Sequence, residues 1–365
     1  MFEPSEQHIK LFYGAHNRKQ LAQSLDISYE QLLYLWDMFK KDPIRLYRHF
    51  ELEKRNGEAR RILAPRADLK DVQRRIATLL ETRFQPSAAA HGFISGRNII
   101  TNARPHVGKQ CILTIDLKDF FESIKVPTIS YFLSRSPFNA QPLTTHFVTQ
   151  FACCRPLHRP SFTGFLPQGS PSSPILSNIV ATRLDLKLIE FARSNNMYYT
   201  RYVDDLTFST NRKHISTGEI AQIVHLIERG LSPFKVNPAK IRIARKGARH
   251  TVTGLTVNEH VNISRRYLKN LRAELYQLEN TPNDSVFHLA LKSSLSERTN
   301  SNQATYYLSE TGETIENFIA NTELKYLQQI EGKIEFVRQV LGEESGYYLS
   351  LRKRFDAIRF GEEEK

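Results

Sequence analysis

The sequence YYTRYVDDLTFS, residues 198–209, places two β-rich segments on either side of the adjacent carboxylates Asp204 and Asp205. Aromatic and β-branched residues favour strands. The pattern therefore predicts a hairpin with a tight acidic turn. An Asp-Asp pair taken alone is weak evidence for a site, because aspartate commonly caps solvated turns.

A third carboxylate, Asp116, ends the apolar run CILTI, residues 111–115, which is typical of a buried strand. Carboxylates at the ends of neighbouring strands form the oxygen-rich kind of site that binds Mg²⁺. Two such ions, roughly 3.5–4 Å apart, can activate a hydroxyl and stabilise a leaving pyrophosphate. Because successive strand side chains face opposite ways, we expect Asp204 and Asp205 to be unequal ligands, with Asp205 more tolerant of substitution.

The remaining patterns predict an α+β fold, in which a helix-backed antiparallel sheet precedes a mainly helical C-terminal part. The part from about residue 264 onward is expected to be broken near Pro282 and in the polar stretch 293–305. The other expected elements are short helices in 5–45, a hairpin in 47–66 turning at Asn56-Gly57, helices in 69–84, 174–193 and 218–230, and strand-like residues 250–263.

The composition favours a polyanionic partner. The 365 residues include 51 Lys+Arg and 38 Asp+Glu, a net charge of +13. Such a surplus favours nucleic acid over a membrane surface. With 40% hydrophobic residues, the chain is expected to be globular and to form one large domain or two to three subdomains.

The cysteines and the N-terminus indicate a cytoplasmic protein with no membrane partner. Cys111, Cys153 and Cys154 do not form a disulfide framework by number or spacing. Cys154 and His158 could begin a metal site, but no CxxC or HxxxH set accompanies them, so zinc is not expected. We find no signal-peptide pattern and no apolar run of the ~18 residues that a spanning helix needs.

Four ordered blocks resemble the catalytic motifs of reverse transcriptases. Residues 202–205 (YVDD) are similar to the catalytic signature, and residues 116–121 (DLKDFF) to the first catalytic motif. Residues 166–171 (LPQGSP) resemble the loop that follows it, and residues 234–240 (FKVNPAK) the later lysine-bearing motif. The match spans roughly residues 45–275.

The resemblance implies a right-hand polymerase fold. It implies an N-terminal helical extension over residues 1–45, fingers and palm over 46–255, and a thumb with an RNA-binding region over 256–365. It also assigns catalysis and metal binding to Asp116, Asp204 and Asp205, with two Mg²⁺ ions for which Mn²⁺ can substitute.

Four further positions acquire nucleotide-binding roles from the resemblance. Phe121 would be a sugar gate whose ring excludes a ribose 2′-OH, although Phe120-Phe121 alone would suggest a core pair. Gln168 would lie against the nucleotide in a Gly-containing loop, which alone could be an ordinary turn. Lys240 would stand near the departing pyrophosphate, and Arg60, after the Asn56-Gly57 turn, could grip the triphosphate.

Two shorter blocks resemble elements of retron reverse transcriptases. Residues 102–106 (NARPH) are similar to their NAxxH element, and residues 252–254 to their VTG element. Between Lys240 and Arg272, nine Lys/Arg accompany one acidic residue, an electrostatic footprint for RNA. His106 could instead be a histidine satisfied in the core, and VTG a strand-edge turn. The expected RNA-binding residues are Asn102, His106, Val252, Thr253, Gly254, Arg265, Arg266, Lys269 and Arg272.

A retron enzyme would use deoxynucleoside triphosphates to copy part of a structured noncoding RNA. The product, multicopy single-stranded DNA, would be primed from an RNA 2′-OH, and an effector protein would join the complex in antiphage defence. These partners are implied by the resemblance. A basic, Arg-rich thumb suits structured RNA, which proteins recognise by shape and 2′-OH contacts.

Several other readings stay open. A group II intron reverse transcriptase usually carries a maturase region after the thumb, and the lack of a Cys/His-rich tail is expected to count against it. Abortive-infection and diversity-generating reverse transcriptases remain alternatives. An RNA-dependent RNA polymerase usually has GDD and tolerates ribose. A catalytically idle RNA-binding protein would not need the full set of aspartates.

Overall fold

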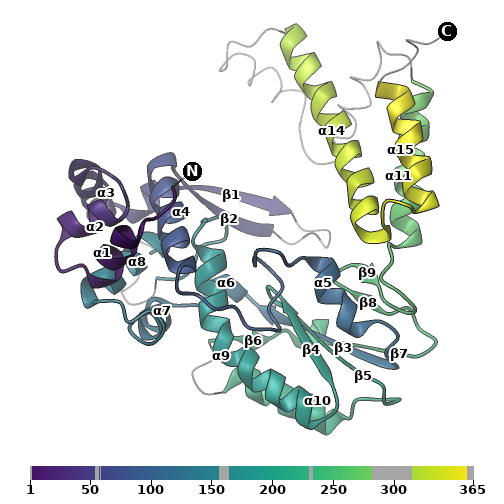
Figure 1. Ribbon diagram of the computed structural model, residues 1–365, viewed down its shortest axis with the longest axis horizontal. Helices are drawn as coiled ribbons and strands as arrows, with labels where there is room; N and C mark the ends of the chain where they lie inside the picture. The colour runs from purple at the N-terminus through teal and green to yellow at the C-terminus, as the bar shows by residue number, and fades with distance from the viewer. Residues whose placement is uncertain are drawn as a thin grey trace. The chain divides into compact units, whose positions relative to one another are not determined.

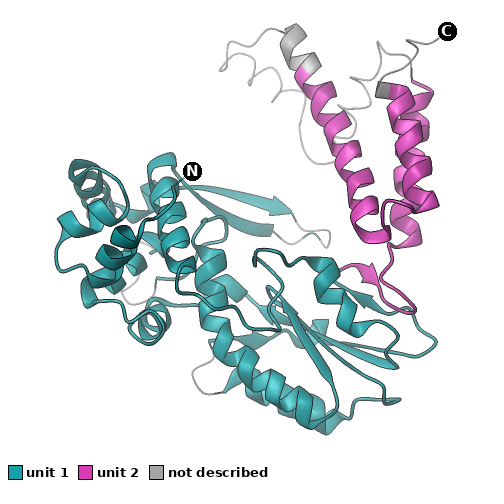
Figure 2. Cartoon of the chain, in the orientation of Figure 1, with its two compact units in different colours: residues 1–253 teal, residues 254–365 magenta. Residues whose placement is uncertain are grey.

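The computed structural model describes residues 2–53, 57, 59–155, 164–229, 233–281 and 315–359. The chain forms two compact units, Met1–Thr253 and Gly254–Lys365 (Figure 2). The N-terminal helices lie in the first unit together with the segments predicted to be fingers and palm.

Each N-terminal helix begins at a side-chain cap. Ser5, Asn17 and Ser28 accept hydrogen bonds from main-chain N–H groups of the first turns, which otherwise lack partners. Trp36 contacts the rings of Phe147 and Phe151, so this region shares the core of the first unit. The elements are α1 (Glu6–Gly14), α2 (Arg18–Ser24), α3 (Tyr29–Lys41) and the 3₁₀ turn η1 (Pro43–Leu46).

The predicted hairpin and the helix after it are confirmed. Strand β1 (Tyr47–Glu53) pairs antiparallel with β2 (Ala59–Pro65), and α4 (Ala67–Glu81) buries the apolar face predicted for it. Gly57 has a φ of +82°, as a turn glycine can, whereas Asn56 lies outside the described residues.

An antiparallel sheet of five strands forms the centre of the first unit (Figure 1). The strand order is β4-β5-β3-β6, and β7 also pairs with β3. Strand β3 contains the CILTI run, whose residues are almost entirely buried because β3 is an interior strand and its side chains pack in the core of the unit. The strands are β3 (Cys111–Lys118), β4 (Tyr198–Tyr202), β5 (Asp205–Thr210), β6 (Lys235–Val236) and β7 (Arg242–Arg245).

Helices surround this sheet and bury their apolar faces in the same core. Helix α9 packs against β4 and α10, so the helix backing predicted for the sheet is present. The elements are α5 (Ile99–Ala103), η2 (Arg104–His106), α6 (Phe120–Ser123), α7 (Val126–Leu133), α8 (Pro142–Ala152), α9 (Ser173–Ser194), α10 (Thr217–Glu228), η4 (Pro238–Lys240) and β8 (Thr251–Val252).

The second unit has a core of its own, built by three helices. Leu271 and Leu275 of α11 pack with Ile334 of α14 and Phe355 of α15. The predicted break at Pro282 and in 293–305 lies outside the described residues. The elements are β9 (Leu255–Thr256), α11 (Arg265–Glu279), α14 (Ile315–Leu341) and α15 (Gly346–Arg359).

The three cysteines are free thiols inside the first unit. Burial raises the pKa of Cys153 to about 12 and that of Cys154 to about 11. His158 lies outside the described residues. Within the described part of the chain, every helix is too short or too polar to cross a bilayer.

Candidate active site

The sheet brings Asp116 and the Asp204-Asp205 pair together. Strands β3 and β5 are antiparallel neighbours, and their register places Asp116 directly opposite Asp205. The Leu117 N–H donates to the Asp204 carbonyl at 3.0 Å, which holds the turn against the end of β3. Asp116 and the Asp204-Asp205 pair, which are distant in the sequence, therefore lie together on neighbouring strands, as the strand-end pattern predicts.

The tight acidic turn predicted between the two strands is present and has two central residues. Tyr202 pairs with Asp205, which leaves Val203 and Asp204 as the two central turn residues. Val203 has a φ of +59°, the sign that a type II′ turn requires at its first central position and that glycine usually supplies. Such conformations cost roughly 1–3 kcal/mol and persist where surrounding contacts enforce them, often at functional sites.

This geometry corrects the argument for unequal aspartates. Asp204 belongs to the turn and Asp205 to the strand, so the alternation of side chains along a strand does not apply to the pair. Asp205 faces Asp116 across the ladder, and cross-strand partners project from the same face of a sheet. The structure thus gives no reason to expect Asp205 to be the more tolerant of the two.

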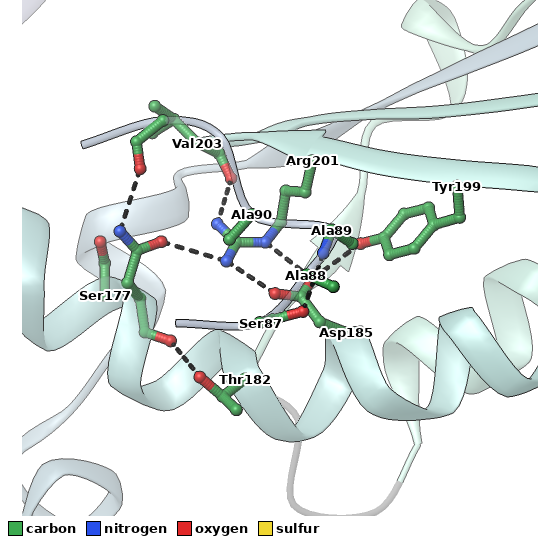
Figure 3. Close-up of polar contacts among 12 residues, drawn as sticks. Ser87, Ala88, Ala89, Ala90, Ser177, Thr182, Asp185, Tyr199, Arg201 and Val203 are labelled. Atoms are coloured by element: carbon green, nitrogen blue, oxygen red, sulfur yellow. Dashed lines mark hydrogen bonds and ion pairs between the residues drawn. The ribbon is translucent and has the colours of Figure 1, made fainter. Parts of the chain in front are cut away.

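A buried ionic network lies beneath the turn (Figure 3). Arg201 is fully buried, and its guanidinium donates to both carboxylate oxygens of Asp185, each at 2.8 Å. The same guanidinium donates to the Val203 carbonyl at 3.1 Å and to the Asn178 side chain at 3.1 Å. The Tyr199 hydroxyl also donates to Asp185, at 2.8 Å. The network ties the strained residue Val203 to helix α9.

Sequence analysis missed Arg201 and Asp185. The only signals were a charged residue inside the β-rich run YYTRYV and an aspartate within the apolar helix 174–193. Either residue could have been exposed, and only the tertiary structure shows that each is the partner of the other.

Electrostatic repulsion accumulates among the three carboxylates. Loss of hydration, followed by the charge of Asp116, raises the pKa of Asp204. Asp205 is the most exposed of the three, yet loss of hydration and the charges of Asp204 and Asp116 raise its pKa to about 6. Lys240 offsets part of this charge, because its ammonium donates to Asp116 at 2.8 Å. A bound cation would offset more.

The donor set suits Mg²⁺, since all three candidate ligands are carboxylates. As the side chains stand, however, no group of three or more His, Cys, Asp or Glu among the described residues is arranged to hold a metal ion. Asp116 is instead engaged by Lys240. The fit therefore rests on donor chemistry and strand register.

Phe121 is the available ring of the Phe120-Phe121 pair. Phe120 is 3% exposed and stacks on Phe234, with ring centroids 5.0 Å apart. Phe121 is half-buried and meets Phe120 edge-on at 5.3 Å. Phe120 is thus the core residue, and Phe121 remains the candidate sugar gate.

Gln168 and Arg60, which were predicted to bind the nucleotide, lie on a loop and on strand β2, and a main-chain hydrogen bond joins these two segments. The Gln168 carbonyl accepts a hydrogen bond from the Leu63 N–H of β2 at 2.8 Å. Gly169 has a φ of +114°, and an added Cβ would lie 3.0 Å from the Leu63 carbonyl oxygen, so glycine is needed there. Arg60 is exposed on the same strand, and its charge opposes a small part of the rise that loss of hydration causes in the pKa of Asp204.

Asn102 and His106 lie inside the protein, which differs from the prediction that they contact RNA. Both are fully buried. The His106 ring bonds to the Ser209 hydroxyl at 2.6 Å and the Thr200 hydroxyl at 2.7 Å, which joins η2 to β5 and β4. Burial lowers the pKa of His106 to about 3, so its ring is neutral. His106 is therefore a core histidine whose two ring nitrogens both have hydrogen-bond partners.

Val252 and Thr253 of the VTG block lie in the first unit, where Thr253 contacts the helix that carries the NAxxH block. Val252 is buried, and the Thr253 hydroxyl donates to the Ile99 carbonyl of α5, the helix that carries Asn102, at 3.4 Å. Thr253 and Gly254 have φ values of +46° and +85°. These positive φ values set the shape of the VTG turn. The hydrogen bond from Thr253 joins the turn to the helix that carries the NAxxH segment.

The four basic residues of α11 that were predicted to bind RNA lie on the surface of the second unit. Arg265, Arg266, Lys269 and Arg272 are all exposed. The apolar residues of the helix, such as Leu268 and Leu275, face the core of the second unit. The amphipathic pattern thus leaves the cations in solvent.

Comparisons with known proteins agree with these features. A family model described as reverse transcriptase (RNA-dependent DNA polymerase) matches residues 52–308. The retron Mx65 reverse transcriptase of Myxococcus xanthus is 35% identical over 269 residues, which cover 71% of this chain and 62% of that protein. The retron Mx162 enzyme of the same organism is 31% identical, covering 70% and 57%. The retron Ec86 reverse transcriptase of Escherichia coli is 31% identical, covering 64% and 70%. The chain thus spans about three fifths of the length of the two Myxococcus relatives.

Proposed function

The chain belongs to the retron-type reverse transcriptases, and from that premise we propose that it is the RNA-directed DNA polymerase of a retron. The observation that carries the proposal is the register of Asp116 opposite Asp205, with Asp204 in the turn beside them. Three crowded carboxylates next to Lys240 favour a reaction centre over a solvated turn. Close like charges destabilise a fold, and such clusters are found mainly at functional sites.

The surrounding residues support deoxynucleotide addition to a primer hydroxyl. When bound by Asp116, Asp204 and Asp205, two Mg²⁺ ions would supply activation of the hydroxyl and neutralise the triphosphate. Arg60 would orient the triphosphate, and Lys240 would stabilise or protonate the leaving pyrophosphate. Gln168 and Gly169 would bound the nucleotide pocket, and Phe121 would exclude a ribose 2′-OH.

The proposed template-primer is a structured noncoding RNA, and the proposed product is multicopy single-stranded DNA primed from an RNA 2′-OH. Exposed cations on α11 support an RNA backbone contact. Asn102, His106, Val252, Thr253 and Gly254 would act by shaping the surface around α5 and the VTG turn. A cytoplasmic complex with an effector protein in antiphage defence completes the proposal.

Two measurements test this function. Primer extension with deoxynucleotides should require Mg²⁺ or Mn²⁺ and stop on chelation. Nucleic acid purified with the protein from its host should contain short DNA joined to RNA through a 2′,5′ branch. Linear complementary DNA alone would contradict the retron assignment. Bound RNA together with no metal-dependent extension would indicate an idle RNA-binding protein and overturn the polymerase assignment.

A further inference from the structure

Phe93 combines solvent exposure with an unusual backbone. Its side chain is 54% exposed, although most phenylalanines of the chain are buried or half-buried. Its φ is +59°, a region that bulky side chains rarely adopt. Neither burial nor conformational preference therefore favours a phenylalanine at this position.

The residues before Phe93 are fastened to the acidic turn. The His91 N–H donates to the Arg201 carbonyl at 2.8 Å, and the Gly92 carbonyl accepts from the Asn178 side chain at 3.0 Å. A Cβ on Gly92 would lie 2.7 Å from the main-chain nitrogen of Val203, so only glycine permits this approach. The position of Phe93 is therefore fixed relative to Asp204 and Asp205.

The Phe93 ring meets the candidate sugar gate. Its centroid lies 6.3 Å from that of Phe121, with the planes inclined at 46°. Phe121 in turn meets Phe120 at 5.3 Å, and Phe120 stacks on Phe234. Phe121 thus contacts Phe120, which belongs to the core, and Phe93, whose preceding residues pack against the acidic turn.

We propose that Phe93 is a positioning residue for sugar selection, which holds the Phe121 ring where it excludes a 2′-OH. The proposal rests on the polymerase function proposed above and deepens it. A gate ring discriminates only if it cannot move aside when the extra hydroxyl arrives. Phe120 limits such movement from the core, and Phe93 limits it from the exposed side, with a backbone anchored to the residues that place the carboxylates.

The test compares kcat/KM for a deoxynucleotide and the matching ribonucleotide in primer extension by the full chain. The variants are Phe93→Ala, Phe93→Leu, Phe121→Ala and the double variant Phe93→Ala/Phe121→Ala. We expect Phe93→Ala to lower the deoxy-to-ribo ratio by about 2- to 10-fold, the factor to which the energy of an aromatic pair corresponds. Phe93→Leu should restore part of the ratio. Tyr34→Ala, at a residue 57% exposed on α3, is the matched control for loss of a surface aromatic ring and should leave the ratio unchanged.

The double variant decides whether Phe93 acts through Phe121. If it does, Phe93→Ala changes the ratio in the wild-type background and has no further effect once Phe121 is alanine. Equal effects in both backgrounds, or an unchanged ratio in Phe93→Ala or in Phe121→Ala, would overturn the positioning role while deoxynucleotide extension continues. A wild-type protein that extends no primer would instead overturn the polymerase function, and this inference with it.

Discussion

Asp116 and Asp205 are direct partners across the antiparallel ladder of β3 and β5, and the next main-chain bond joins Leu117 to Asp204. The spacing of the carboxylates is thus set by the register of a buried sheet. Register is strongly specified in such a sheet, because a slip by one residue would exchange the side chains that β3 presents to its two packed faces. Packing of the apolar side chains of β3 therefore also sets the positions of the acidic residues.

All three aspartates should be needed for DNA synthesis. One carboxylate charge is lost from the proposed metal site in each of the variants Asp116→Asn, Asp204→Asn and Asp205→Asn. We expect each variant to lose primer extension and to keep RNA binding. Asp119→Asn is the matched control, because Asp119 is exposed three residues from Asp116 and its φ of +47° is tolerated by asparagine. Extension by Asp116→Asn at the wild-type rate would disprove the assignment.

Removal of one partner of the Arg201–Asp185 pair should strongly destabilise the fold. Asp185→Asn leaves the fully buried guanidinium without its counter-charge, which typically costs 3–5 kcal/mol, so we expect a loss of about that size in the free energy of unfolding. Chemical denaturation measures it. Asp37→Asn breaks an exposed pair with Lys41 and should change the free energy of unfolding far less than Asp185→Asn does. Equal losses in the two variants would rule out the special status of Asp185.

Buried His106 should make the fold sensitive to acid. Its pKa of about 3 in the fold lies below the ordinary value near 6.5, so between these values the unfolded chain binds a proton that the fold does not. The free energy of unfolding should therefore fall as the pH drops below about 6.5, by up to about 1.4 kcal/mol per pH unit from this residue. Burial also lowers the pKa of His91, to about 4, which adds in the same direction.

Denaturation between pH 4 and pH 7 would test this prediction on His106→Gln. The variant is expected to be less stable at neutral pH, because it loses the hydrogen bonds to Ser209 and Thr200, but to show a shallower dependence of stability on pH. His16→Gln, at an exposed position, provides the comparison for loss of a histidine. A slope that His106→Gln leaves as steep as in the wild type would contradict the prediction.

The exposed cations of α11 should set the salt dependence of RNA binding. Replacing Arg265, Arg266, Lys269 and Arg272 by glutamine should weaken binding and flatten the plot of log affinity against log salt. The slope should change by up to about 3 if all four contact phosphates, since each contact contributes about 0.7 on a single strand. Replacing Lys40 and Lys41 of α3 should have little effect. An unchanged slope in the quadruple variant would remove α11 from the RNA interface.

The sequence by itself determined the elements whose signals are local. The apolar run before Asp116 predicts a buried strand, and the residues around Asp204-Asp205 predict a hairpin; both are present in the structure. Apolar periodicity likewise predicts α4 and α9. Such patterns are readable because burial of one face repeats at the period of the helix or strand.

Only the tertiary structure decided which distant side chains meet and which face inward. The partnership of Arg201 with Asp185 and that of His106 with Ser209 and Thr200 carry no periodic signal, because each depends on two segments packing together. The strained turn at Val203, held by Arg201 and approached by Gly92, is a product of those contacts. The sequence around a lone polar residue does not show whether its side chain is exposed or buried, because burial becomes tolerable only when the fold supplies its hydrogen-bond partner.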